Sequence, residues 1–395
     1  MSKWKTCTIS DIGTVVGGAT PSTKKEENYL DGTISWITPK DLAGFSGRFI
    51  SRGERNITEI GLNSCSTQLM PAHTVLFSSR APIGYVAIAE KEVCTNQGFK
   101  SVIPNADTDY MFLYYLLKYN KNKIENLGSG TTFKEVSGST MRNIEVKVPE
   151  TIEEQKKIAS ILSEIDDKIE NNIAINDNLL QQSLCIYTEM IGSSNKDGCI
   201  GNYCSIKSGF AFKSKWWQDS GVPVIKIGSI NQDYLNLSDC SYVSEDKISL
   251  ANDFIVGGGD LLIAMTGATI GKFAMVPKVS ETILVNQRVG KFFLGDNQIS
   301  RLPFIYCTLK QPEVVSEVIN RGQGSAQPNI SASDIMSIPC VIPSSEVIDE
   351  FNKSTSQMFE LIINNQYENA VLANTRDSIL PKLMSGELDV SELNL

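Results

Sequence analysis

The motifs that could carry catalysis are incomplete in this chain of 395 residues. Residues 267–272 (GATIGK) resemble a phosphate-binding loop, but the run is one residue too short, and Phe273 stands where a Ser or Thr would hold Mg²⁺. Residues 128–130 (GSG) lack the third glycine of a dinucleotide-binding fingerprint. His73 is the only histidine, and we interpret it as a structural or surface residue that corresponds to Asp260 in the second half. The sequence therefore predicts no catalytic centre and no metal site in this chain.

A second group of side chains could bind a nucleic acid. Lys and Arg neutralise phosphates, while Ser, Thr, Asn and Gln can donate to phosphate oxygens or reach base edges. The candidate DNA contacts are Ser22, Thr23, Lys24, Lys25, Lys40, Ser79, Arg80, Asn96, Gln97, Thr131, Thr132, Lys213, Lys215, Trp216, Lys226, Thr266, Lys272, Asn286, Gln287, Arg288, Ser325 and Gln327. Solvated surface lysines explain many such clusters, but recurrence at corresponding turns of a repeated chain favours a binding role.

The overall charge at first argues against a nucleic-acid partner. Lys and Arg number 36 against 45 Asp and Glu, which gives a net charge of −9. Residues 1–150 hold 17 basic and 15 acidic side chains, and residues 198–343 hold 12 of each. Residues 151–197 hold 4 against 9, and residues 344–395 hold 3 against 9. The excess acidity is thus confined to two segments, and the rest of the chain is free to present positive patches.

An internal repeat organises the chain. Residues 73–87 resemble residues 260–274, with Ile83-Gly84 aligned on Ile270-Gly271 at an offset of 187. Asn96-Gln97 aligns with Asn286-Gln287 at an offset of 190, and residues 128–137 align with residues 322–331 at 194. The shared order and the slowly drifting offset predict a duplication with small loop insertions.

Each repeat predicts a mixed α/β lobe followed by a long helix. Apolar helical stretches are expected at Tyr110–Tyr119 and Pro303–Leu309. Short β-rich runs separated by turn residues lie at residues 33–37, 74–79, 84–89, 99–103, 222–227, 260–265, 271–276 and 290–295. We expect an α/β fold class with lobes at residues 1–150 and 198–343, and helical segments at residues 151–197 and 344–395.

The two helical segments carry matching apolar stripes. Residues spaced by three, four or seven positions share one face of a helix. The expected pairing residues are Ile158, Leu162, Ile165, Ile169, Asn172, Met358, Ile362, Asn365, Leu372 and Ile379. Asn172 and Asn365 fall at the same place in each repeat, and a polar residue in an apolar seam can fix register. We expect the helices to pair antiparallel and resemble a coiled coil; packing of each helix on its own lobe is the alternative.

The sequence predicts a cytoplasmic chain. Its first residues have no apolar signal region, and no stretch reaches the roughly 18 apolar residues of a membrane span. The nine cysteines are scattered and form no C-x-x-C pair. An odd, dispersed set of this kind is typical of free, mostly buried thiols in a reducing compartment.

Three segments of the chain are typical of one known family: the opening GGATPSTKKEENYLDGTISWITPKDL (17–42), the linker VPETIEEQKKIASILSEIDDKIENN (148–172) and the C-terminal LANTRDSILPKLMSGELDV (372–390). Together they resemble the DNA-specificity subunit of type I restriction-modification systems. The resemblance covers essentially the whole chain. The second lobe departs most, because residues 210–214 (FAFKS) replace the Thr-Pro-Ser turn of the first.

This resemblance implies two target-recognition domains, each reading one half of a bipartite site in double-stranded DNA, held apart by the helices. It implies two modification (methyltransferase) subunits docked on the helices, and restriction subunits in the full complex. S-adenosylmethionine, ATP and Mg²⁺ are then expected on the partner subunits, with no cofactor on this chain and no membrane partner. Two other classes remain open: a fused restriction or methyltransferase enzyme that retains recognition domains, and a duplicated structural scaffold without a DNA role.

Overall fold

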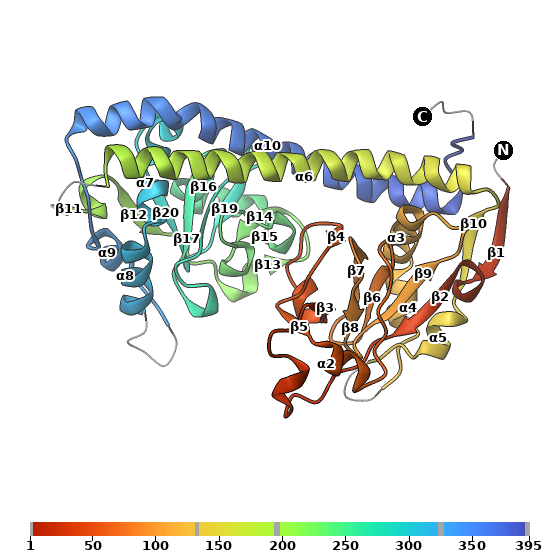
Figure 1. Ribbon diagram of the computed structural model, residues 1–395. Helices are drawn as coiled ribbons and strands as arrows, with labels where there is room; N and C mark the ends of the chain where they lie inside the picture. Colours follow the sequence, from red (N-terminus) through yellow and green to blue (C-terminus); the bar gives the residue numbers. More distant parts are fainter. Residues whose placement is uncertain (1–2, 131–133, 193–197, 323–327, 392–395) are drawn as a thin grey trace. The chain divides into compact units, whose positions relative to one another are not determined.

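The computed structural model describes residues 3–130, 134–192, 198–322 and 328–391 (Figure 1). The chain divides into two compact units, one made of residues 1–168 and 372–395 and the other of residues 169–371. Each unit contains one α/β lobe and a part of each of two long helices, α6 (Ile152–Met190) and α10 (Ser345–Ser385). Both boundaries between the units therefore fall inside a continuous helix.

The first lobe is built on a five-stranded sheet of order β2-β9-β6-β7-β4. A three-stranded sheet has the order β5-β3-β8, with β3 antiparallel to β5 and parallel to β8. Strands β1 and β10 pair antiparallel where the lobe begins and ends. The elements are β1 (Trp4–Thr8), α1 (Ile9–Ile12), β2 (Gly13–Gly17), η1 (Glu26–Asn28), β3 (Ile34–Ile37), η2 (Pro39–Leu42), β4 (Phe49–Ile50), β5 (Arg55–Ile57), α2 (Glu59–Asn63), β6 (Val75–Ser79), β7 (Ile83–Ala89), β8 (Cys94–Thr95), β9 (Lys100–Pro104), α3 (Tyr110–Tyr119), α4 (Lys121–Asn126), α5 (Gly138–Arg142) and β10 (Glu145–Pro149).

The second lobe repeats this plan with changes at the sheet edges. One sheet has the order β12-β20-β17-β18, and the other has the order β13-β15-β14-β19-β16. The elements are β11 (Gly198–Cys199), η3 (Ile200–Asn202), β12 (Ser205–Ser208), η4 (Ser214–Trp216), β13 (Trp217–Gln218), β14 (Val222–Ile225), η5 (Ile227–Ser229), η6 (Leu237–Asp239), β15 (Ser241–Val243), η7 (Glu245–Phe254), β16 (Ile255–Val256), β17 (Leu261–Ala264), η8 (Gly267–Thr269), β18 (Phe273–Met275), β19 (Ile283–Val285), β20 (Val289–Phe293), α7 (Gln298–Leu309), α8 (Pro312–Gly322), α9 (Ala332–Met336) and β21 (Pro339–Cys340).

The strand order confirms the predicted duplication. Strands β2, β9, β6 and β7 of the first lobe have the same neighbours as β12, β20, β17 and β18 of the second. In the other sheet, the antiparallel β5-β3 and parallel β3-β8 pairs are matched by β15-β14 and β14-β19. The terminal pair β1-β10 is matched by β11-β21. The two lobes therefore share one topology although few of their side chains are identical.

The predicted alignment of His73 with Asp260 is wrong by one residue. The Ala89 N–H donates to the Thr74 carbonyl, and the equivalent Val276 N–H donates to the carbonyl of Asp260. Thr74 is therefore the counterpart of Asp260. Residues 80–82 connect the paired strands in the first lobe and residues 265–272 connect them in the second, and the offset between the lobes is 186 before this connection and 187 after it.

His73 lies in the turn that precedes β6. Its backbone has a φ of 68°, its N–H donates to the Ala89 carbonyl at 2.7 Å, and its ring stacks on Tyr110 at a centroid distance of 4.2 Å. The true counterpart is Gly259, with a φ of 91° and the same backbone bond to Val276. Both residues adopt the left-handed region that this turn requires.

The predicted helix at Tyr110–Tyr119 is confirmed as α3, whereas the one at Pro303–Leu309 begins too late. Helix α7 starts at Gln298, so Pro303 lies inside it. Proline removes one N–H donor and distorts the preceding turn. The next N–H, on Phe304, donates to the side chain of buried Asn352 on α10 at 3.0 Å. Three of the four residues at 298–301 are polar, with Ile299 the exception, so the apolar signal of the first turn was too weak to predict it.

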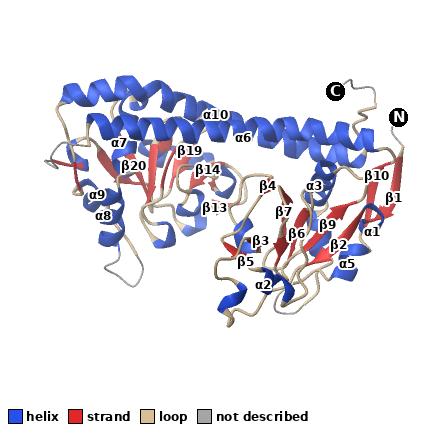
Figure 2. Cartoon of the chain, viewed as in Figure 1, coloured by secondary structure: helices blue, strands red, loops and turns tan. Residues whose placement is uncertain are grey.

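Helices α6 and α10 run antiparallel within each unit, as predicted (Figure 2). In the second unit, Asn365 Nδ2 donates to Asn176 Oδ1 at 2.8 Å, and Asn172 Nδ2 donates to Asn369 Oδ1 at 2.9 Å. As the residue number rises along α6, the number of its partner on α10 falls. Among the ten expected pairing residues, Ile158, Leu162, Asn172, Ile362 and Asn365 are buried, and Ile165, Ile169, Met358, Leu372 and Ile379 are half-buried.

The helices also pack on the lobes, so the two alternatives coexist. In the first unit, Ile158 and Leu162 of α6 share one core with Phe112 of α3 and with Leu380 of α10. In the second unit, Phe351 and Ile362 of α10 share a core with Phe304 of α7. Each lobe therefore packs on its part of the helix pair through buried apolar side chains. Such burial stabilises the packing by roughly 25 cal/mol per Å² of apolar surface removed from water.

Candidate nucleic-acid interface

In the first lobe, backbone hydrogen bonds gather three loops around residues 95–98. The Ala19 N–H donates to the Thr95 carbonyl, the Asn96 N–H donates to the Ile37 carbonyl, and the Ser79 N–H donates to the Gly98 carbonyl at 2.7 Å. Thr20 Oγ1 also donates to Gln97 Oε1. These bonds bring Gln97, Arg80 and the loop that carries Lys24 and Lys25 to one region of the lobe.

The second lobe uses the same backbone connections around residues 285–288. The Phe210 N–H donates to the Val285 carbonyl, the Asn286 N–H donates to the Ile225 carbonyl at 3.0 Å, and the Met265 N–H donates to the Arg288 carbonyl at 3.0 Å. Thr266, Asn286, Gln287 and Arg288 are thus brought together, as their counterparts are in the first lobe.

Glu135 in the first lobe and Asn329 in the second lie at equivalent bridges and mark a chemical difference between the lobes. In the first lobe, Arg80 Nη1 lies 3.5 Å and Lys100 Nζ 3.6 Å from the carboxylate of Glu135. In the second lobe, a pocket of about 270 Å³ lies at the equivalent place. Its lining includes Ser208, Thr266, Gln287, Arg288, Asn329 and Ser331. The first lobe therefore presents charged groups where the second presents a pocket lined mainly by neutral polar ones.

The hydroxyl of Thr266, a residue that lines this pocket, has no hydrogen-bond partner among the described residues. Thr266 is 2% exposed. Buried polar atoms in native proteins are almost always satisfied, so an orphaned one at a pocket wall marks a place for a bound group or water. Ser79 in the first lobe is also fully buried with an unpaired hydroxyl.

Lysines of the second lobe lie over tryptophan rings. Lys213 Nζ lies 5.2 Å and Lys247 Nζ 5.1 Å from the centroid of the Trp216 ring, and Lys226 Nζ lies 3.7 Å from that of Trp217. Burial lowers the pKa of the Lys226 ammonium because the charged form loses hydration. Such cation–π pairs attract each ammonium group to the face of a tryptophan ring.

The remaining candidates differ in exposure. Lys40 is exposed and its Nζ lies 2.7 Å from Glu54 Oε2, so the carboxylate already compensates its positive charge. Thr131, Thr132, Ser325 and Gln327 lie outside the described residues. The exposed candidates are Ser22, Thr23, Lys24, Lys25, Lys40, Gln97, Lys213, Lys215, Gln287 and Arg288, and the half-buried ones are Arg80, Asn96, Trp216, Lys226, Lys272 and Asn286.

Sequence reasoning missed several residues of these clusters. Glu135 and Asn329 lie at equivalent positions of the aligned segments, so the repeat alignment already carried the signal that the lobes differ there. Lys100 and Lys247 were missed because their partners, Glu135 and Trp216, are far away in the chain. Among the described residues, no three His, Cys, Asp or Glu side chains gather as metal ligands, and no helix is both long and apolar enough to cross a membrane.

Known proteins resemble this chain over half of its length or more. The model of the type I restriction modification DNA specificity domain matches residues 1–181 and again residues 193–371. The MjaIX specificity subunit of a type I restriction enzyme from Methanocaldococcus jannaschii is 33% identical, over 99% of this chain and 94% of that protein. The EcoR124I/EcoR124II specificity subunit from Escherichia coli is 28% identical over 51% of this chain and 50% of that protein.

A solved structure shares the fold. The crystal structure of the S subunit of a type I restriction-modification system from M. genitalium superposes with a TM-score of 0.59 at 18% identity, covering 97% of this chain and 96% of that one. The twofold match of one domain model agrees with the duplicated topology of the two lobes.

Proposed function

Since the chain belongs to the family of type I restriction-modification DNA specificity subunits, we propose that each lobe reads one half of a bipartite DNA site. The two long helices set the distance between the halves and dock two methyltransferase subunits. Restriction subunits join the full complex. S-adenosylmethionine, ATP and Mg²⁺ belong to those partners, and the complex works on DNA in the cytoplasm.

The observation that carries this proposal is one topology with different side chains at the same place. The end of β6 and the end of β17 have equivalent backbone bonds, to Val136 in the first lobe and to Ile330 in the second. Beside them stand Arg80 and Glu135 in one lobe, and Thr266 and Asn329 in the other. A scaffold that binds no ligand would have no functional reason to retain the same backbone topology in both lobes while the residues at these positions differ.

The chemistry of these pairs suits different bases. Arginine donates two bonds to the O6 and N7 atoms of guanine, and a carboxylate accepts from the N4 amine of cytosine. Asparagine pairs with adenine through N6 and N7. Arg80 with Glu135 in the first lobe, and the exposed Asn329 in the second, would therefore favour different half-sites.

Charge separates the roles of lobes and helices. The helical segments carry the whole acidic excess, 18 acidic side chains against 7 basic ones, so they repel DNA and suit a basic protein surface. The lobes carry exposed lysines such as Lys24, Lys25 and Lys213 on loops.

Two alternatives to a DNA-specificity subunit have different tests. Methylation by the purified chain alone would support a fused enzyme. Absence of salt-dependent DNA binding would support a structural scaffold without a DNA role.

Salt dependence of DNA binding by the chain reconstituted with its methyltransferase subunits tests the DNA role. Replacing Lys24 and Lys25 by Gln should reduce the magnitude of the log–log slope of the binding constant against salt by about one for each phosphate that the two lysines neutralise. The matched control is Lys353→Gln, which removes an exposed lysine from α10. An equal effect of the control, or binding without salt dependence, would contradict the proposal.

A further inference from the structure

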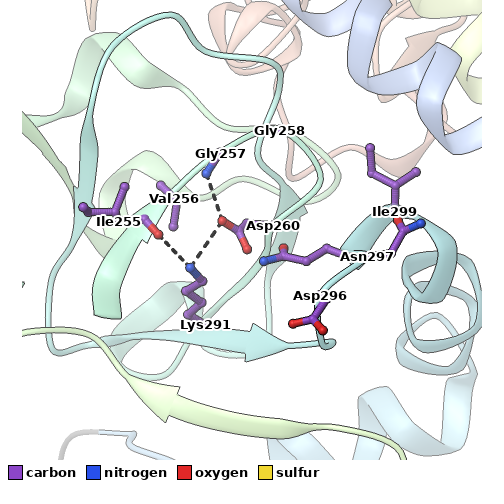
Figure 3. Close-up of a pocket in the computed structure, with 10 residues that line it drawn as sticks. Ile255, Val256, Gly257, Gly258, Asp260, Lys291, Asp296, Asn297 and Ile299 are labelled. Carbon is purple, nitrogen blue, oxygen red and sulfur yellow. Dashed lines mark hydrogen bonds and ion pairs between the residues drawn. The ribbon is translucent and has the colours of Figure 1, made fainter. Parts of the chain in front are cut away.

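The second lobe holds a pocket that shares no lining residue with the candidate DNA contacts. Its volume is about 460 Å³, and it lies between the segment that follows η7 and the first turn of α7 (Figure 3). Asp260 and Lys291 form its inner wall, and Asp296, Asn297 and Gln298 line it from the start of α7. Gly258, Asp296 and Asn297 are exposed at its rim.

Asp260 is a buried carboxylate with one oxygen unused. It is 4% exposed, and its Oδ2 accepts the Gly257 N–H at 2.9 Å and lies 3.4 Å from Lys291 Nζ. Lys291 Nζ also donates to the Ile255 carbonyl at 2.6 Å. No described residue donates a hydrogen bond to Oδ1. Burial raises the pKa of Asp260, and Lys291, the Gly257 N–H and the nearby Gln298 side chain partly offset this rise.

The first lobe shows that the fold does not require this charge pair. The counterpart of Asp260 is Thr74, and the counterpart of Lys291 is Ser101 on β9. Thr74 and Ser101 are both fully buried, so the same two sheet positions hold neutral hydroxyl groups there. A buried ion pair is weak evidence of stabilisation. Its presence in one lobe only therefore points to a ligand of that lobe.

The charge of the pocket selects the kind of ligand. Asp260 and Asp296 carry two negative charges against one positive charge on Lys291, so the lining is net negative and disfavours phosphate. A divalent cation needs about six oxygen ligands, and an ammonium group already occupies one side of Asp260. A guanidinium group has planar, paired donors for a carboxylate and is weakly hydrated, which suits a half-enclosed site.

We propose that this pocket binds a guanidinium group and that the group is an arginine side chain of a partner subunit. The guanidinium donates to Asp260 Oδ1, and Asp296 compensates its charge at the rim. The exposed rim allows the side chain to remain attached to a covering protein surface. Only the identity of the partner rests on the proposed function; the pocket and its ligand chemistry do not.

Methylguanidinium is the probe, titrated against the full chain by saturation-transfer difference NMR. N-methylurea, of similar size and shape but neutral, is the matched control ligand. We expect saturable binding of methylguanidinium only. Asp296→Asn, at an exposed position, should weaken binding severalfold without changing the fold. The double variant Asp260→Thr with Lys291→Ser copies the first lobe and should abolish binding. Equal binding of both probes, or undiminished binding by both variants, would overturn the proposal.

A second arm identifies the source of the group. In the complex with the methyltransferase subunits, the partner arginine should exclude methylguanidinium, and Asp296→Asn should weaken assembly about tenfold, as expected when a charge-assisted hydrogen bond is removed. Binding of the probe to the complex as well as to the free chain would refute the partner assignment. Because the probe experiment on the free chain uses no DNA, its outcome is independent of whether the lobes read half-sites.

Discussion

Seven residues added to each long helix should lengthen the gap between the two half-sites and leave the half-sites themselves unchanged. The insertions go between Lys168 and Ile169 of α6 and between Val371 and Leu372 of α10, where the two units divide. Seven residues add about 10 Å of helix, which corresponds to at most about three base pairs at 3.4 Å each. They also leave the two ends of each helix only about 20° out of phase.

The position of the insertions preserves the contacts inside each unit. Asn176 keeps Asn365 in the second unit, and Asp166 keeps Arg376 in the first. The measurement is the methylated motif in the genome of a host that carries the altered chain with its partner subunits. As a control, seven residues in α6 alone should disturb the pairing and lower the level of methylation. An unchanged gap after the paired insertion would show that the helices do not set the spacing.

Removal of Asp166 should destabilise the first unit by about 3 kcal/mol, the low end of the range for breaking a buried ion pair. Its side chain is 6% exposed, and it accepts hydrogen bonds from Tyr115 Oη at 2.7 Å and from Arg376 Nη1 at 2.6 Å. One carboxylate thus joins α3 of the lobe, α6 and α10. Asp166→Ala leaves the buried Tyr115 hydroxyl and the half-buried Arg376 guanidinium without this acceptor, and the cost is the lost hydration of these donors.

The matched control is Asp377→Ala, which removes the other carboxylate that pairs with the Arg376 guanidinium. Asp377 lies 2.8 Å from Arg376 Nη2, but its side chain is 63% exposed, so its removal should cost about 0–1 kcal/mol. Urea unfolding followed by circular dichroism compares the two variants. Equal losses in the free energy of unfolding would show that burial of Asp166 is not the reason that its ion pair stabilises the unit.

The duplicated fold was readable from sequence because its frame depends on a few obligatory residues. Gly84 and Gly271 have φ values of 97° and 80°, and an added Cβ on Gly84 would lie 2.6 Å from a side-chain carbon of Lys121. Such positions keep their glycine and so anchor the alignment. The strand before them carries no such constraint, since apolar residues fit either register, and there the alignment of His73 with Asp260 was off by one.

The candidate interface was only partly readable. Exposed lysines on turns stand out in the sequence, but what they face does not. Arg80 meets Glu135 across 55 positions of the chain, and Lys247 reaches Trp216 across 31. These pairs form because sheet topology brings distant turns together, which single-sequence patterns do not encode. The buried polar links, such as Asp166 with Arg376, escaped for the same reason.

Whether each lobe reads its own half of the site is tested most directly by crosslinking the assembled complex to its mapped DNA site. A photo-crosslinking amino acid is placed at Lys25 in one variant and at Lys213 in another, both exposed loop positions. The crosslinked nucleotide is then located. Our account predicts that the probe at residue 25 marks only one half-site and the probe at residue 213 only the other. Crosslinks from both positions to the same half-site would contradict it.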